Sequence, residues 1–178
     1  MDDTVPFGSR TYLLMLVLLV FARGMDFLST WVATPTLLLE ANPLAKRLGW
    51  KWGSVVNIAL CLGFAFFALP AIIITTCSVL VAAHNFQRAW LMRTMGETNY
   101  RDWYVERVSE TRPTLYLFCL FGETVLTAAL GGLLLYFSEL AVIPLGIGMG
   151  ILAYAGAITF YTLLALWRRR RAERWKTN

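Results

Sequence analysis

Three ionisable side chains, Arg23, Asp26 and Glu123, lie in segments that are otherwise apolar enough to cross a membrane. A charge at membrane depth costs about 2.5–3.5 kcal/mol or more, so such residues point to function by default. Arg23 precedes Asp26 by three residues and Asp26 precedes Thr30 by four, which places all three on one helix face. Pairing of Arg23 with Asp26 or with Glu123 would lower the cost of each charge.

Two carboxylates inside a membrane could act as general acid and general base. Asp26 and Glu123 are therefore the candidate catalytic residues. Neither lies in a recognised catalytic motif, and Arg23 would hold a neighbouring carboxylate in its ionised form. The same side chains could instead bind a ligand or fix the register of the helices.

A second polar group follows the first apolar segment, where the chain reads Glu40-x-Asn42-Pro43. Pro43 favours a turn, so Glu40 and Asn42 can hydrogen-bond an exposed backbone corner. Alternatively, the corner folds back over the first apolar segment, and oxygen atoms of Asp26, Glu40 and Asn42 form a site for a hard cation, a proton or a polar headgroup. Asn57, near the start of the second apolar segment, could then reach Asp26.

The sequence also contains a weak internal repeat of the first motif. Asp26 precedes Thr30 in "GMDFLSTW", and Glu123 precedes Thr127 at the same spacing in "GETVLTAA". Two similar helical hairpins, related by an axis along the membrane normal, would bring Asp26 and Glu123 face to face at the same depth. Chance similarity between apolar segments is the alternative interpretation.

A family resemblance is carried by two short motifs, Asp26-x-x-x-Thr30 and Glu40-x-Asn42-Pro43-Leu44. This pattern resembles a family of small, uncharacterised bacterial and archaeal multi-pass membrane proteins. The resemblance covers residues 20–65 and implies a preserved polar corner in a bacterial or archaeal cytoplasmic membrane. The family has no established activity, so no reaction is implied. The segment 84–113 and the arginine-rich tail have no counterpart in its pattern.

The amino-acid composition indicates that membrane-spanning helices carry these residues. Of the 178 residues, 58% are hydrophobic and 15% charged, and the mean hydropathy is +0.59, which leaves too little polar surface for a soluble domain. We predict an all-α, polytopic membrane protein in which residues 1–178 form one domain, a four-helix transmembrane bundle. The predicted spans are about 11–33, 54–83, 114–137 and 140–167. The second span is too long for one upright crossing and holds Pro70 near its middle, so we expect it to kink, to tilt or to continue into the cytosol.

Lysine and arginine positions predict the orientation of the chain. The segment 84–113 and the tail 168–178 are rich in arginine, and basic segments stay on the cytoplasmic side. Both termini are then cytoplasmic. The loop with Lys46, Arg47 and Lys51 is then external, although the same rule favours a cytoplasmic position for basic residues. The tail is expected to contact the anionic headgroups of the lipid bilayer, and binding to nucleic acid is not expected.

The segment 84–113 mixes aromatic and basic residues at helical spacing. We predict two short amphipathic helices that lie in the headgroup plane and anchor the membrane surface, or that dock a partner. Their interfacial aromatic residues are Phe86, Trp90, Tyr100, Trp103 and Tyr104. In the last span, Gly146-x-x-x-Gly150 favours close helix approach, either within the bundle or between subunits.

No cofactor or metal site is predicted from the residue types present. His84 is the single histidine of the sequence, so neither bis-histidine haem ligation nor a histidine-rich metal centre can form. Cys61, Cys77 and Cys119 lie far apart in apolar segments and suit small buried residues. No glycine-rich phosphate loop precedes a helix.

Three functions remain open at this point. The first, which we favour from sequence, is a non-enzymatic accessory or assembly subunit that docks a protein partner or a second copy. In it, Arg23, Asp26 and Glu123 fix the helix register. The second is an ion- or solute-binding or transport protein that uses the intramembrane carboxylates and the Glu40–Asn42 corner. The third is an intramembrane enzyme that acts on a lipid or a peptide.

Overall fold

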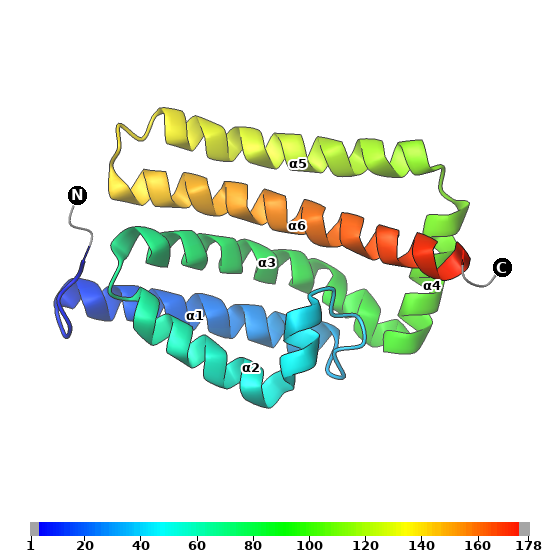
Figure 1. Ribbon diagram of the computed structural model, residues 1–178, viewed down its shortest axis with the longest axis horizontal. Coiled ribbons are helices and arrows are strands. Elements are labelled where there is room, and N and C mark those ends of the chain that lie inside the picture. Colours follow the sequence, from blue (N-terminus) through cyan, green and yellow to red (C-terminus); the bar gives the residue numbers. More distant parts are fainter. Residues whose placement is uncertain (1–3, 175–178) are drawn as a thin grey trace.

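The computed structural model describes residues 4–174, with side chains through Arg168, and these residues form six helices (Figure 1). The helices are α1 (Arg10–Ala33), α2 (Pro43–Phe64), α3 (Ala68–Met95), α4 (Glu97–Glu110), α5 (Pro113–Tyr136) and α6 (Val142–Arg174). Within residues 4–174 the backbone contains no named β-strand, and Thr4 and Phe67 form an isolated bridge. The prediction of an all-α fold is therefore confirmed.

Four of the helices, α1, α3, α5 and α6, are long and apolar enough to cross a membrane. The shortest of them, α1 and α5, have 24 residues each. At about 1.5 Å per residue this exceeds the roughly 30 Å of a bilayer core. On α5, Phe118 is 73% exposed and Leu126 is 71% exposed, so its outer face fits lipid and not water. The prediction of a multi-pass membrane protein is confirmed.

The helices α1 and α3 pack side by side and run in the same direction (Figure 1). At one end the Val5 N–H donates to the Phe66 carbonyl at 2.8 Å. At the other end the Thr34 hydroxyl donates to the Glu97 carboxylate at 2.6 Å. Between these ends α2 runs back along α1, so the chain returns to its starting side before α3 begins.

The prediction of one continuous second span over residues 54–83 is wrong. The helix α2 ends at Phe64, Phe67 is extended (φ −126°, ψ 106°), and α3 begins at Ala68. Pro70 lies in the first turn of α3, where its missing N–H needs no partner within the helix. A helix continuing from α2 would lose a hydrogen bond at Pro70. The proline therefore marks the start of a helix and not a kink inside one.

The bundle has two ends, which differ in charge. We call the end that holds residues 4–9, 65–67 and 137–141 the first end, and the end that holds 34–42 and 96–112 the basic end. Helix ends and loops at the first end contribute one described basic residue, Arg10. Those toward the basic end contribute Lys46, Arg47, Lys51, Arg88, Arg93, Arg101, Arg107, Arg112 and Arg168.

This arrangement corrects the predicted topology. The loop after α1 and the segment 84–113 were expected on opposite sides, yet Glu97 accepts hydrogen bonds from Thr34 and Thr36 of that loop. The described chain also starts at the first end and finishes at the basic end, which disagrees with two termini on one side (Figure 1). The cause is the return pass by α2, whose Lys46, Arg47 and Lys51 weaken its hydropathy.

Glycines place α6 between α3 and α5. A Cβ added at Gly148 would lie 2.8 Å from the Gly131 carbonyl oxygen of α5. A Cβ at Gly150 would lie 2.6 Å from the Thr76 Cβ of α3, and one at Gly146 would lie 2.8 Å from Ile72. The predicted Gly146-x-x-x-Gly150 face therefore packs within the chain and not between subunits.

The segment 84–113 differs from its prediction in its first half. Residues 84–95, including Phe86 and Trp90, continue α3 without a break, so no separate interfacial helix forms there. Residues 97–110 do form their own helix, α4, which crosses the basic end of the bundle (Figure 1). Of the predicted tail 168–178, residues 175–178 lie outside the described residues. Its contact with lipid headgroups stays a prediction.

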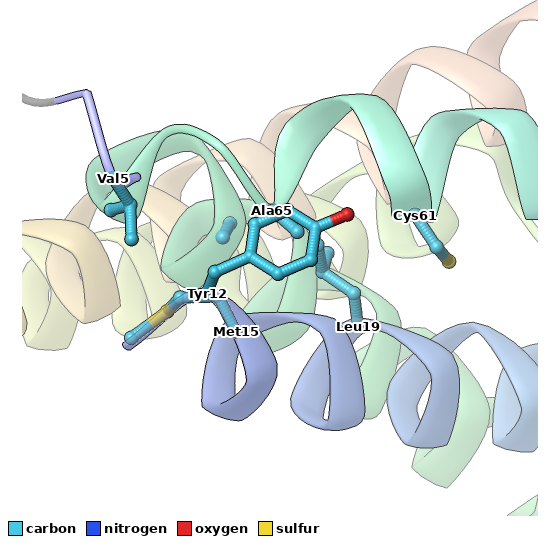
Figure 2. Close-up of a cluster of buried hydrophobic side chains, with 7 residues drawn as sticks. Val5, Tyr12, Met15, Leu19, Cys61 and Ala65 are labelled. Carbon is cyan, nitrogen blue, oxygen red and sulfur yellow. The ribbon is translucent and has the colours of Figure 1, made fainter. Parts of the chain in front are cut away.

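A hydrophobic cluster ties α1, α2 and α3 together near the first end (Figure 2). Tyr12 is 3% exposed, and its ring lies 4.9 Å from that of Phe66, centroid to centroid. The buried members of this cluster are Val5, Tyr12, Met15, Leu19, Cys61, Ala65 and Ala71. This packing holds α2 against α1 and α3 at the first end.

Candidate functional site

Arg23 connects three helices through its guanidinium group. Its Nη1 donates to Asp26 Oδ2 at 2.8 Å on the same helix, α1. The same nitrogen donates to Ser78 Oγ of α3 at 3.2 Å, and Nε donates to Asn57 Oδ1 of α2 at 2.5 Å. The side chains of Arg23 and Asp26 are 26% and 17% exposed, so the ion pair lies between the helices and is shielded from lipid.

Helical spacing and local hydrogen bonds orient the side chains that contact Arg23. The helical spacing of Arg23 and Asp26 makes their contact possible, and the predicted ion pair is present. Asn57 Nδ2 donates to the Gly53 carbonyl at 2.7 Å, which turns Oδ1 toward Arg23. Asn57 was expected to reach Asp26, but it joins the cluster through Arg23 instead.

A second polar layer lies one to two turns nearer the basic end. Asn85 Nδ2 of α3 donates to Ser29 Oγ and to Thr30 Oγ1 of α1, both at 3.3 Å. Ser29 is fully buried, and its hydroxyl donates to the Asp26 carbonyl at 2.9 Å. Sequence reasoning missed Ser78 and Asn85. Their spacing of seven residues, two helical turns, is the signal that could have found them.

The polar layers face a cavity of about 800 Å³ between α1, α2, α3, α4 and α6, to which the α1–α2 loop and the first turn of α5 also contribute. Most of its wall is apolar. Its polar lining comprises Arg23, Asp26, Thr30, Thr34, Glu40, Asn42, Asn57, His84, Asn85, Arg88 and the tyrosines Tyr100, Tyr104, Tyr116 and Tyr161, with Thr162. A smaller cavity of about 340 Å³ shares Arg23 and Leu60 with the larger one. Arg23 therefore borders both cavities.

The Glu40–Asn42 corner makes local backbone hydrogen bonds. Glu40 Oε1 accepts from the Asn42 N–H at 2.7 Å, and Asn42 Oδ1 accepts from the Leu44 N–H at 3.0 Å as the N-cap of α2. Both side chains nevertheless line the large cavity with Asp26. Among the described residues, no group of three or more His, Cys, Asp or Glu side chains could hold a metal ion.

Glu123 and Thr127 do not join this site. Both lie on α5, which packs against α6, and the Glu123 side chain is exposed. Among the described residues Glu123 forms no ion pair, and Arg23 pairs with Asp26 instead. Since α1 and α5 run in opposite directions, they do not fit two hairpins related by an axis along the membrane normal (Figure 1).

The predicted interfacial aromatic residues divide into two groups. Trp90 is 66% exposed, whereas Tyr100 of α4 is 7% exposed and faces the cavity. The Tyr100 ring stacks on Tyr104 at 6.2 Å, and the Tyr104 hydroxyl lies 2.9 Å from that of Tyr116 on α5. Trp103, at 37% exposed, packs on Tyr100. Position at the membrane surface stays a prediction for α4, while Tyr100 and Tyr104 belong to the cavity wall.

Glu97, which sequence reasoning did not identify, ties the loop after α1 to α4. Its carboxylate accepts four hydrogen bonds from residues of that loop. Burial of the carboxylate alone would raise the pKa of Glu97, but the hydrogen bonds from Thr34, Thr36 and Leu38 together hold this pKa below its usual value. The carboxylate is therefore ionised at neutral pH.

The chain was compared with protein-family models, curated proteins and solved structures, and none of them matches it. The resemblance of the motifs at Asp26 and Glu40 to a prokaryotic membrane family therefore stays a prediction. The site is defined by its own geometry: a polar network at the boundary of an apolar-walled cavity inside a membrane bundle.

Proposed function

We propose that this membrane protein binds an amphipathic solute in the cavity between α1, α2, α3, α4 and α6. The observation that carries the proposal is the cavity itself, about 800 Å³ in volume, with Arg23, Asp26 and Asn57 at its inner boundary. A mostly apolar wall with a few convergent polar groups is typical of small-molecule sites. The apolar wall suits a hydrocarbon body, and the inner boundary suits a polar group.

The cavity lining can complement both signs of charge on such a solute. Arg88 lines the cavity and forms no ion pair with any described residue. Asp26 uses Oδ2 for Arg23, and Glu40 uses Oε1 for a backbone N–H, so each carboxylate keeps a second oxygen that accepts no hydrogen bond from the described residues. Charge-assisted hydrogen bonds to these groups would orient the solute.

The other two functions have less support from the geometry. A mechanism that uses Asp26 and Glu123 together needs the two carboxylates at one site, and they lie on helices that do not pack against each other. The accessory-subunit hypothesis depends on exposed apolar faces, which lipid covers equally well. Docking of a protein partner or a second copy therefore stays a prediction.

The charge distribution supports an orientation in the membrane. Lysine and arginine gather near the basic end, and such residues stay on the cytoplasmic side. In this orientation the first end is external, and the described chain runs from outside to inside. Residues 34–42, α4 and the approach to the cavity then face the cytoplasm. A bacterial or archaeal cytoplasmic membrane agrees with this placement.

Mild-detergent purification followed by solvent extraction and mass analysis tests the function. We expect about one amphipathic molecule per chain. Ala157→Phe, which fills the cavity from α6, should remove that molecule, and Asp26→Asn should weaken its retention. Glu123→Gln changes an exposed carboxylate outside the cavity and is the matched control. The same bound molecules in all four proteins would show that the cavity is not the binding site.

A further inference from the structure

The loop between α1 and α2 forms one wall of the cavity at the basic end. Leu37, Glu40 and Asn42 of this loop line the cavity. On the facing side, Tyr100 and Tyr104 of α4 line it too. Any solute that enters between these two walls must separate them.

Glu97 at the start of α4 holds the two walls together. Its Oε2 accepts from the Thr34 and Thr36 hydroxyls at 2.6 and 2.7 Å, and from the Leu38 N–H at 3.2 Å. Its Oε1 accepts from the Thr36 N–H at 3.0 Å. One ionised side chain therefore satisfies four donors of the loop, and charge-assisted bonds of this kind are stronger than neutral ones.

A glycine separates the loop held by Glu97, together with the first turns of α2, from the rest of α2. Gly49 interrupts α2 with φ +65° and ψ −172°, a conformation that glycine adopts without penalty. Lys46 Nζ donates to the Leu38 carbonyl at 3.1 Å, so the loop and the first turns of α2 are joined. Beyond Gly49, Trp50 of α2 packs against α1, where its ring centroid lies 5.7 Å from that of Phe27.

The loop also stores strain that the Glu97 contact maintains. Leu37 has φ +58°, in the left-handed region that is unfavourable for a leucine. Such a conformation persists only where surrounding contacts hold it. Release of the loop would let Leu37 relax, which favours a second, open arrangement of residues 34–48.

We propose that residues 34–48 form a lid over the cavity, hinged at Gly49 and latched by Glu97. Opening of the lid admits the solute from the basic end. The inference rests on the proposed function for what the lid admits, but the motion itself can be measured without any ligand. Besides the latch, the Trp50 indole donates to the Pro35 carbonyl at 2.9 Å and the Thr34 N–H donates to the Thr30 carbonyl at 2.7 Å, so the lid stays attached to α1 and α2 near its start.

Cysteine labelling tests the latch. In a background with Cys61, Cys77 and Cys119 changed to alanine, the reporter Ala157→Cys lies in the cavity wall. A small charged thiosulfonate reagent should label it about three- to tenfold faster when Glu97→Gln is added, because opening becomes more frequent. Thr36→Ala, which removes one of the four hydrogen bonds, should give a smaller increase.

Two controls separate lid opening from general loosening. Glu106→Gln changes another α4 carboxylate, one paired with Arg107, and should leave labelling unchanged. A reporter at Ala155, 4% exposed on the same helix, should stay protected in the Glu97→Gln protein. Equal labelling of Ala157→Cys with and without Glu97→Gln, or faster labelling at both reporters, would overturn the lid. Faster labelling at Ala157→Cys alone, in a protein that retains no amphiphile, would leave the lid standing and refute the proposed function.

Discussion

Single side chains decide how the polar network is held, and Arg23 is the first of them. It contributes the contacts to Asp26, Asn57 and Ser78 that join α1, α2 and α3. We expect Arg23→Ala to lower the free energy of unfolding by about 1–3 kcal/mol, because it breaks these hydrogen bonds and leaves a partly buried carboxylate without its partner. Unfolding by denaturant in one fixed detergent measures this loss.

The exposed pair Arg101–Asp102 provides the control for Arg23. Its side chains are 49% and 63% exposed, so water and salt screen the attraction. We expect Arg101→Ala to change the free energy of unfolding by less than about 0.5 kcal/mol. Equal losses from Arg23→Ala and Arg101→Ala would show that the intramembrane pair is no stronger than a surface pair.

Glu97 gives the loop after α1 a defined response to pH. Hydrogen bonding lowers the pKa of Glu97 below its usual value, so the stabilisation is complete above about pH 4.3 and is lost as pH falls through the lowered pKa. We expect hydrogen-exchange protection of the Thr36 and Leu38 amides, corrected for intrinsic rates, to hold down to about pH 4. Glu97→Gln should weaken that protection and remove its acid dependence. Loss of protection near pH 6 in the parent protein would contradict this assignment.

At the scale of residues, the sequence identifies charged members of the polar network more readily than neutral ones. Arg23 and Asp26 stand out because a charge in an apolar segment has few explanations, and their spacing fixes the pair. Ser78 and Asn85 resemble ordinary small or polar residues until α3 is packed on α1. Glu123 stands out as strongly as Asp26 yet lies outside the site, because sequence spacing does not say which helices are neighbours.

At the scale of helices, glycines set the distance between α3 and α6. A Cβ at Gly150 would lie 2.9 Å from the Ile73 carbonyl oxygen, a backbone atom that cannot rotate away. We expect Gly150→Ala to lower the free energy of unfolding by about 1–3 kcal/mol through this overpacking. Gly156→Ala on the same helix meets no atom within 4 Å and should be neutral or slightly stabilising. Similar effects of both substitutions on thermal unfolding would contradict close packing at Gly150.

Hydropathy found the spans α1, α5 and α6 close to their true bounds but misjudged the segment between α1 and α5. It joined the apolar end of α2 to the start of α3, because Phe64 and Ala68 are separated by three residues that are themselves apolar or aromatic. A proline inside a long apolar segment suggests a kink, although proline fits the first turn of a helix equally well. Because the return pass by α2 is absent from that prediction, α1 receives the direction opposite to the one proposed here, while the directions of α3, α5 and α6 agree with it.

At the scale of the whole molecule, the return pass by α2 explains why two groups of basic residues were expected on opposite sides of the membrane. With four spans alone, Lys46, Arg47 and Lys51 fall outside while the arginines of 84–113 fall inside. With α2 counted as a pass, both groups lie toward the basic end. The charge rule and the fold then agree, which supports the orientation proposed above.

Reporter fusions at the two ends of the chain test this orientation. With the basic end in the cytoplasm, a fusion before α1 should report an external position, and one after α6 should report a cytoplasmic position. The physical reason is that external placement of the basic end would require translocating lysine and arginine from the loop after α1, α2, α4 and the region around Arg168. Single-cysteine labelling at Ala141, exposed in the α5–α6 turn, and at Ser109, exposed near the end of α4, provides an independent readout from intact cells. Two cytoplasmic fusions would restore an even number of passes, and the parallel packing of α1 on α3 could not then hold in the membrane.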